Sequence, residues 1–362
     1  MKILVPTNFD SAESNYFSSS SDEIILYGRN SKDEVGSVFD IFLKNNIKQT
    51  FSAIKKFVAN ASRLSKKFFY LMDAVCLDNT EIDRKYHFKI VDLIENIADA
   101  GAAGVIVSYP MLHQIVKAKR PELLTIISPG LKIESYQSID AMKRLGADGI
   151  IFSPIVARDR KFLEMAEREF TGEYDFIYAN SGCYIKSIFC VRHLAEMSHF
   201  SQNFIDHEMT RFDIGGLMCL LDKNEKPERF LTTPFLTPAR AAEYRKLYPR
   251  MNLMISDSDG TFASVRHVFD SFFRGKKIDN IFSIVKNCYF MKEIRSRSLS
   301  LSPADAERIF DEGLAEKSSC AYKDCGKCGL CLKFYEKYVK YDESERKKNI
   351  VELKNLETSC SV

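Results

Sequence analysis

Short, almost wholly apolar runs alternate along this chain with longer segments in which apolar residues recur at helical spacing. The segment 48–64 shows the helical pattern, and so does the one that carries Ile90, Leu93, Ile94 and Ile97 on one face. Glycine, proline, asparagine or aspartate follows most of the apolar runs, as expected at strand ends. The expected strands are residues 3–5, 23–27, 68–72, 104–108, 124–128, 149–153, 174–179 and 252–256.

Apolar strands that alternate with amphipathic helices imply a parallel sheet covered on both faces. Seven such units precede residue 200, and the eighth strand, 252–256, follows only after a long gap. We therefore predict an α/β fold, a (β/α)8 TIM-type barrel with a long insertion, about 200–250, before the last strand. A doubly wound open sheet is the alternative.

The alternating pattern ends after Arg274, and the length of 362 residues exceeds the usual size of a single core. We predict a barrel over residues 1–275 and a small C-terminal extension over 276–362. The extension contains a cysteine-rich segment, 320–331.

Composition narrows the class of protein only a little. The 52 basic and 49 acidic residues give a formal charge of +3, too small to indicate nucleic-acid binding by itself. The N-terminal pattern lacks the apolar core of a signal peptide, and no apolar run approaches a membrane span. We expect a cytoplasmic protein without a membrane span, whose ten cysteines serve as metal ligands or buried apolar groups rather than disulfides.

Four cysteines are expected over one end of the barrel, because side chains just beyond the strands form the functional face of this fold. Cys76 follows the third strand, Cys183 and Cys190 follow the seventh, and Cys219 lies in the insertion. Four thiolates are the usual ligand set of an iron–sulfur cluster, so we predict such a cluster here. The sequence leaves the fourth ligand open between Cys76, Cys288 and His193, and isolated cysteines can also be buried apolar groups.

A second group of thiols occupies the C-terminal extension. Cys320, Cys325, Cys328 and Cys331 lie within twelve residues, and Gly326 and Gly329 permit a tight wrap. Such density predicts a metal site, either a zinc ion or a second iron–sulfur cluster.

Polar residues near the expected strand ends are candidates for substrate binding. The same residue types also cap helices and stabilise turns, which is the alternative for each one singly. Nucleophilic serine motifs, HExxH and glycine-rich phosphate loops are absent from the sequence, as is the early three-cysteine motif of radical S-adenosylmethionine enzymes. The substrate-binding candidates are Asn8, Asp73, Ser128, Asn180 and Asp257.

Several segments together resemble peptidase family U32, the collagenase-like proteases. The resemblance covers roughly residues 1–275, and the C-terminal four-cysteine segment falls outside the family's common core. Cys183-x6-Cys190 is similar to the family's first cluster-binding pair, Cys219 matches loosely, and the usual spacing of the third and fourth cysteines is missing. The other similar segments are 92–110, 138–152, 158–159, 236–244 and 254–256.

The resemblance implies a barrel with a 4Fe–4S cluster held by four cysteines. Relatives include enzymes assigned to oxygen-independent hydroxylation of ubiquinone precursors and of RNA, and others carry the name of collagen-degrading proteases. We therefore expect a cluster-dependent enzyme acting on a small-molecule or RNA substrate, served by an electron-transfer partner. The alternatives are a U32-type peptidase, for which the sequence offers no recognisable activated nucleophile, and a non-catalytic subunit that carries a cluster beside a homologous partner.

Overall fold

The computed structural model describes most of the chain. The described residues are 1–17, 20, 22–30, 33, 35–38, 50–169, 172–183, 189–202, 214–256, 261–286, 299–314 and 325–359. The predicted site residues Asp257, Cys288 and Cys320 lie outside these ranges.

Eight parallel strands form one sheet, in the spatial order β6-β5-β4-β3-β2-β1-β8-β7. Every described neighbour pair is parallel. The arrangement confirms the predicted (β/α)8 barrel, and each strand lies where the apolar runs placed it. The strands are β1 (Lys2–Pro6), β2 (Glu23–Gly28), β3 (Lys67–Met72), β4 (Gly104–Val107), β5 (Leu124–Ile127), β6 (Gly149–Ile150), β7 (Phe176–Tyr178) and β8 (Asn252–Met254).

The barrel closes between β6 and β7 through a single bridge rather than a full ladder. Ile151 pairs with Phe176, and the Phe152 amide donates to the Phe176 carbonyl at 3.0 Å. The buried carboxylate of Asp175 reinforces this seam, because it accepts from the Ile150 amide at 2.8 Å and pairs with Lys143 at 3.0 Å.

Alternation along the strands fills the inside of the barrel. Residues one position apart point to opposite faces, so Leu4 belongs to the inner cluster while Ile3 and Val5 belong to the outer one. The described inward-facing side chains therefore fill the interior of the barrel. The inner cluster comprises Leu4, Ile25, Tyr27, Phe69, Leu71, Ile106, Ile126, Ile151, Tyr174, Phe176, Tyr178 and Met254.

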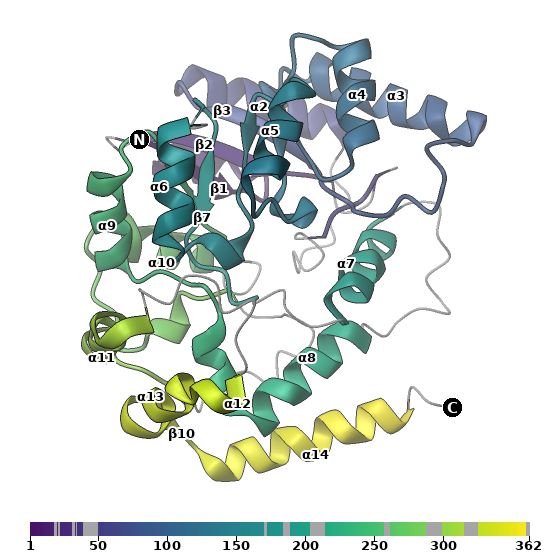
Figure 1. The fold of residues 1–362 in the computed structure, drawn as a ribbon. Helices are drawn as coiled ribbons and strands as arrows, with labels where there is room; N and C mark the ends of the chain where they lie inside the picture. The colour runs from purple at the N-terminus through teal and green to yellow at the C-terminus, as the bar shows by residue number, and fades with distance from the viewer. Residues whose placement is uncertain are drawn as a thin grey trace.

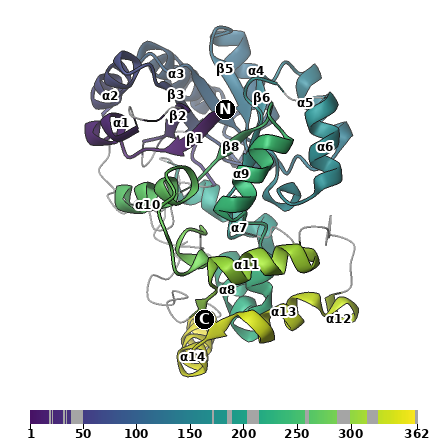
Figure 2. The same ribbon diagram turned by 90° about the vertical axis from the view of Figure 1, so that its left-hand side faces the viewer.

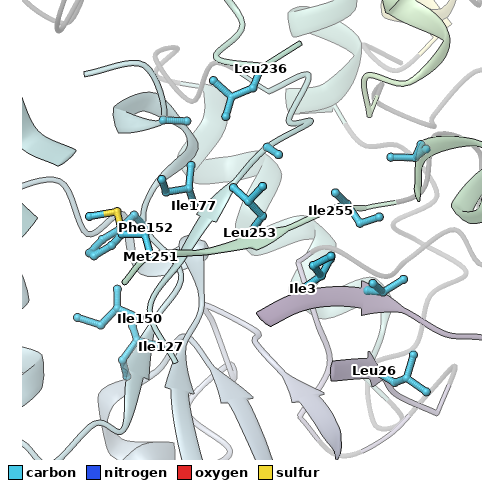
Figure 3. Close-up of a cluster of buried hydrophobic side chains, with 14 of the residues drawn as sticks. Ile3, Leu26, Ile127, Ile150, Phe152, Ile177, Leu236, Met251, Leu253 and Ile255 are labelled. Atoms are coloured by element: carbon cyan, nitrogen blue, oxygen red, sulfur yellow. The ribbon is translucent and has the colours of Figure 1, made fainter. Parts of the chain in front are cut away.

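Helices cover the outside of the barrel and bury the outer faces of the strands. Figure 3 shows part of this layer, with Ile3, Leu26 and Leu253 among the labelled residues. Polar caps begin several of these helices: the side chain of Thr50 accepts from the Ala53 amide. The covering helices are α1 (Ser11–Phe17), α2 (Phe51–Arg63), α3 (Arg84–Asp99), α4 (Pro110–Lys119), α5 (Tyr136–Arg144), α6 (Arg160–Glu169), α9 (Pro238–Leu247) and α10 (Phe262–Phe273).

The insertion before β8 and the C-terminal extension pack against each other at one end of the molecule (Figures 1 and 2). Leu353, fully buried, lies among Leu217, Leu220 and Leu221 of the insertion. The chain between β7 and β8 contributes α7 (Phe189–Phe200) and, within the insertion, α8 (Ile214–Glu225). The extension contributes α11 (Pro303–Ile309), α12 (Cys325–Cys328), α13 (Leu330–Tyr338), α14 (Glu343–Ser359) and the antiparallel pair β9 (Leu299–Ser300) and β10 (Lys340–Tyr341).

An arginine joins the barrel to the extension. The guanidinium of Arg158 lies 5.8 Å from the ring centre of Phe235 and 5.6 Å from that of Phe310. Cation–π contacts of a buried arginine are worth on the order of 1–2 kcal/mol each. Among the described residues, no helix is long and apolar enough to cross a membrane.

Candidate functional site at the barrel mouth

The last turn of α7 and the residues just after it lie over the carboxyl ends of β2 and β3. Arg29, which follows β2, donates to the carbonyl of Ser201 at 3.0 Å. The Ser37 amide donates to the Ser201 hydroxyl at 2.8 Å, and the Val75 amide donates to the Ser198 hydroxyl at 3.0 Å. These bonds fix α7 against the edge where functional groups gather in β/α barrels.

Cys76 meets a histidine of α7 at this edge. The Nε2 atom of His199 lies 3.2 Å from the Cys76 Sγ atom, and both side chains are half-buried. The Gln202 side-chain amide donates to the Cys76 carbonyl at 2.8 Å, which fixes the loop that carries the thiol. The sequence predicted Cys76 at the mouth but gave no sign of this partner.

A buried carboxyl lies in the loop that follows the thiol. Glu81 is buried, and its Oε1 atom accepts from the Tyr109 hydroxyl at 3.0 Å. That hydrogen bond, with partial burial and the charges of Glu81 and Cys76, raises the pKa of the Tyr109 phenol above its ordinary value. Within the part of the chain that the structure describes, the other carboxyl oxygen of Glu81 has no hydrogen-bond partner.

Asp73 and Ser128, both predicted, are brought together by the fold. One Asp73 oxygen accepts from the Ser37 hydroxyl and from the Val38 amide at 3.3 Å, and the other accepts from the Ser128 hydroxyl at 3.0 Å. Complete burial raises the pKa of Asp73 to about 6, against the opposing effect of these hydrogen bonds. Ser128 also accepts from the Gly130 amide, so part of its role is to hold a turn.

Asn8 lies beside a carboxyl group that sequence reasoning missed. The Asn8 amide donates to Glu13 at 2.8 Å, and the Thr7 hydroxyl donates to the same oxygen. Burial raises the pKa of Glu13 to about 7, because desolvation outweighs the two hydrogen bonds. The signal in the sequence was an acidic residue in the first turn of the helix after β1.

Asn180 lies at the end of β7, and its side-chain amide forms hydrogen bonds with backbone groups. Its Oδ1 accepts from the Ser256 amide at 2.8 Å, and its Nδ2 donates to the carbonyls of Ser256 and Ile284. This geometry ties the ends of β7 and β8 to the segment that leads toward the extension. Asp257, the fifth predicted substrate-binding residue, follows immediately but lies outside the described residues.

The Cys183 segment is held by two contacts, one with the backbone of a neighbouring segment and one with a buried lysine ammonium group. Ser181 pairs with Lys286, and a Cβ atom on Gly182 would lie 1.8 Å from the Lys286 carbonyl oxygen, so only glycine fits there. The Lys223 ammonium, 3% exposed, donates to the Gly182 carbonyl at 2.8 Å. Cys183, the next residue after Gly182, is half-buried.

The other two thiols of the barrel group lie on adjacent helices. Cys190 is buried in the first turn of α7, Cys219 is buried on α8, and the two helices pack together (Figure 1). Cys219 and Lys223 are four residues apart and share one face of α8, the face that reaches Gly182. Cys183, Cys190 and Cys219 therefore come from segments that contact one another.

Cys76 lies at the other end of α7. His199, the contact of Cys76, is nine positions after Cys190, a separation of about 13 Å along the helix at 1.5 Å per residue. His193, three residues after Cys190, is on the neighbouring part of the helix surface. Over the described residues, no three His, Cys, Asp or Glu side chains converge closely enough to hold one metal ion.

The C-terminal cysteines lie where a turn joins two helices. Cys325 and Cys328 are the first and last residues of α12, and Cys331 is in the first turn of α13. Gly329, with φ of +59°, makes the turn between them, as its predicted role in a tight wrap requires. Cys328 is exposed and Cys331 is half-buried.

In a comparison with known protein families, one family model matches part of the barrel. The model described as "Peptidase family U32" matches residues 42–193, a stretch that includes Cys76, Cys183 and Cys190. No curated protein matches the chain.

Among solved structures, the chain is similar to the U32 peptidase Mk0906, with 17% identity, coverage of 58% of this chain and 80% of that one, and a TM-score of 0.47. It is also similar to an α-amylase from Geobacillus thermoleovorans (8% identity, 70% and 69% coverage, TM-score 0.36). A third similar structure is a glycerol uptake operon antiterminator-related protein from Thermotoga maritima (12% identity, 56% and 92% coverage, TM-score 0.28).

Proposed function

Because residues 42–193 match the model of peptidase family U32, we propose that the chain is an iron–sulfur-dependent barrel enzyme that hydroxylates an organic or RNA substrate without molecular oxygen. The observation that supports this proposal is the grouping of Cys183, Cys190 and Cys219 on three contacting segments beside the buried Lys223. A 4Fe–4S cluster needs four protein ligands, and thiolates are the usual ones.

The donor set suits such a cluster in chemistry and in charge, and binding would have to draw the three thiols together, since no three such ligands converge among the described residues. A cluster with four thiolate ligands is anionic, and the Lys223 ammonium, held in the interior next to the Cys183 segment, offsets that charge. His193 and Cys288 are the candidates for the fourth ligand. The 13 Å of helix between Cys190 and the Cys76 contact is the reason we leave Cys76 out of the set, which departs from the prediction made from barrel position.

The protein's own residues would bind and orient the substrate at the mouth, while a bound cluster supplies electron-transfer chemistry. Asn8 contributes a buried side-chain oxygen that has no hydrogen-bond partner among the described residues. Asp73 and Ser128 already bond to each other, so their proposed role is to shape the floor of the mouth.

Metal and sulfide analysis of anaerobically purified variants tests the proposal. We expect about four irons and four sulfides per chain in the natural protein, or about eight if the C-terminal cysteines also carry a cluster. Cys183→Ala and Cys219→Ala should lose the iron of the barrel cluster, since each removes a thiolate ligand. Cys76→Ala is the matched control and should retain it.

Full iron content in Cys183→Ala would contradict the ligand assignment. Zinc without sulfide would reduce the C-terminal group to a structural zinc site and remove the basis for redox chemistry. Two further outcomes favour the alternatives: collagen cleavage by the pure protein indicates a peptidase, and co-purification with a second barrel protein without turnover indicates a cluster-carrying subunit.

A further inference from the structure

We propose that Cys76 and His199 form a nucleophilic dyad at the barrel mouth that attacks an acyl carbonyl carbon. The contact is direct, with 3.2 Å between the thiol sulfur and the imidazole Nε2. A thiol within reach of an imidazole base is the arrangement by which cysteine nucleophiles are activated. This site is separate from the proposed cluster, which lies toward the other end of α7.

The surrounding structure fixes both partners in position. Ser198 and Gln202, on either side of His199 in sequence, bond to Val75 and to the Cys76 carbonyl respectively. Three contacts from residues 198–202, at the end of α7 and just after it, thus hold one short loop. Such support for a reactive pair is what a preorganised site requires.

The loop itself is held in an uncommon backbone conformation. Asp78 and Asn79, just after the thiol, have φ angles of 54° and 60°, in the left-handed region. Both side chains of the dyad are half-buried, so the pair is accessible to solvent and yet confined. Glu81, buried in the same loop with one carboxyl oxygen unpartnered in the described structure, supplies an acceptor for a polar group of a bound ligand.

The chemical step balances with water as the only co-reactant. The Cys76 sulfur forms a bond to the acyl carbon while its proton passes to His199 Nε2. The bond from that carbon to the leaving oxygen or nitrogen breaks, and the leaving group takes the proton from His199. Water, deprotonated by His199, then releases the acid and restores the thiol.

Two probes and three variants test the dyad. With p-nitrophenyl acetate we expect a burst of p-nitrophenol and an acetyl group on the peptide that contains Cys76, found by mass spectrometry. Iodoacetamide should alkylate Cys76 on the order of 10- to 30-fold faster in the natural protein than in His199→Asn, because an unassisted thiol is only a few per cent ionised near pH 7. His267→Asn is the control. It alters a histidine of α10 that bonds to Ser283, and it should leave the rate of Cys76 alkylation unchanged.

Iron content separates this proposal from the proposed function. Cys76→Ser should abolish the burst and keep the natural iron content. Loss of iron in Cys76→Ser would place Cys76 in the cluster and overturn the dyad, and so would an alkylation rate that His199→Asn does not change. Natural protein that shows the burst but contains no iron would support the dyad and contradict the cluster.

Discussion

Glu13 is a fully buried carboxyl whose pKa is raised to about 7, chiefly by desolvation. The folded protein therefore binds a proton that the unfolded chain releases at a lower pH. The free energy of unfolding should fall as pH rises from about 4.5 to 7, and remain reduced above that.

Glu13→Gln should remove this pH dependence, because an amide keeps the hydrogen-bond acceptor without a charge to bury. At pH 8 we expect the variant to be more stable than the natural protein by up to roughly 3 kcal/mol, with the difference vanishing near pH 4. Urea unfolding at both pH values measures this. Equal differences at the two pH values would show that Glu13 is not the titrating group.

Individual site residues could be predicted only in part. Asp73 and Ser128 were predicted separately as residues at strand ends, and they meet because β3 and β5, on either side of β4, end at the same edge of the parallel sheet. The Cys76–His199 contact joins residues 123 positions apart, and its geometry depends on where α7 settles over the mouth. Hydrophobic periodicity carries no information on that placement.

At the scale of elements, all eight strands were predictable, because buried parallel strands are short apolar runs with glycine or polar residues at their ends. The packing of α14 against α8 could not be predicted from the sequence. Both helices have weakly separated apolar and polar faces, and a single leucine of α14 enters the contact fully buried.

Leu353→Ala should destabilise this contact by about 2–4 kcal/mol, since it removes a buried side chain and leaves a cavity among Leu217, Leu220 and Leu221. Hydrogen exchange of α14 and α8 measures the loss locally. Val351→Ala, at a position 59% exposed on the same helix, is the matched control and should have little effect. Similar exchange in both variants would mean that α14 is held by other contacts.

At the scale of the whole molecule, the seam between β6 and β7 decides whether the barrel is closed. A Cβ atom on Gly149 would lie 2.1 Å from the Tyr174 carbonyl oxygen, across that seam. Gly149→Ala should therefore force the two edges apart and cost about 1–3 kcal/mol of stability.

Urea unfolding measures that cost, and exchange of the Phe152 amide, which donates to the Phe176 carbonyl, reports on the seam itself. Gly172→Ala is the control, because the nearest atom to its added Cβ would be the flexible end of Lys143, at 3.0 Å, while the nearest backbone atom would lie at 3.7 Å. An unchanged Phe152 amide in Gly149→Ala would show that the seam can widen without opening.

The packing of α14 on α8 also has a consequence for biosynthesis. Leu353 is 132 residues later in the chain than Leu221, so a ribosome adding about 5–20 residues per second needs roughly 7–26 seconds to reach it. During that interval the leucines of α8 have no α14 to cover them. The nascent chain therefore exposes the apolar surface of α8 while the barrel is being assembled. This is the stage at which a chaperone would be needed most.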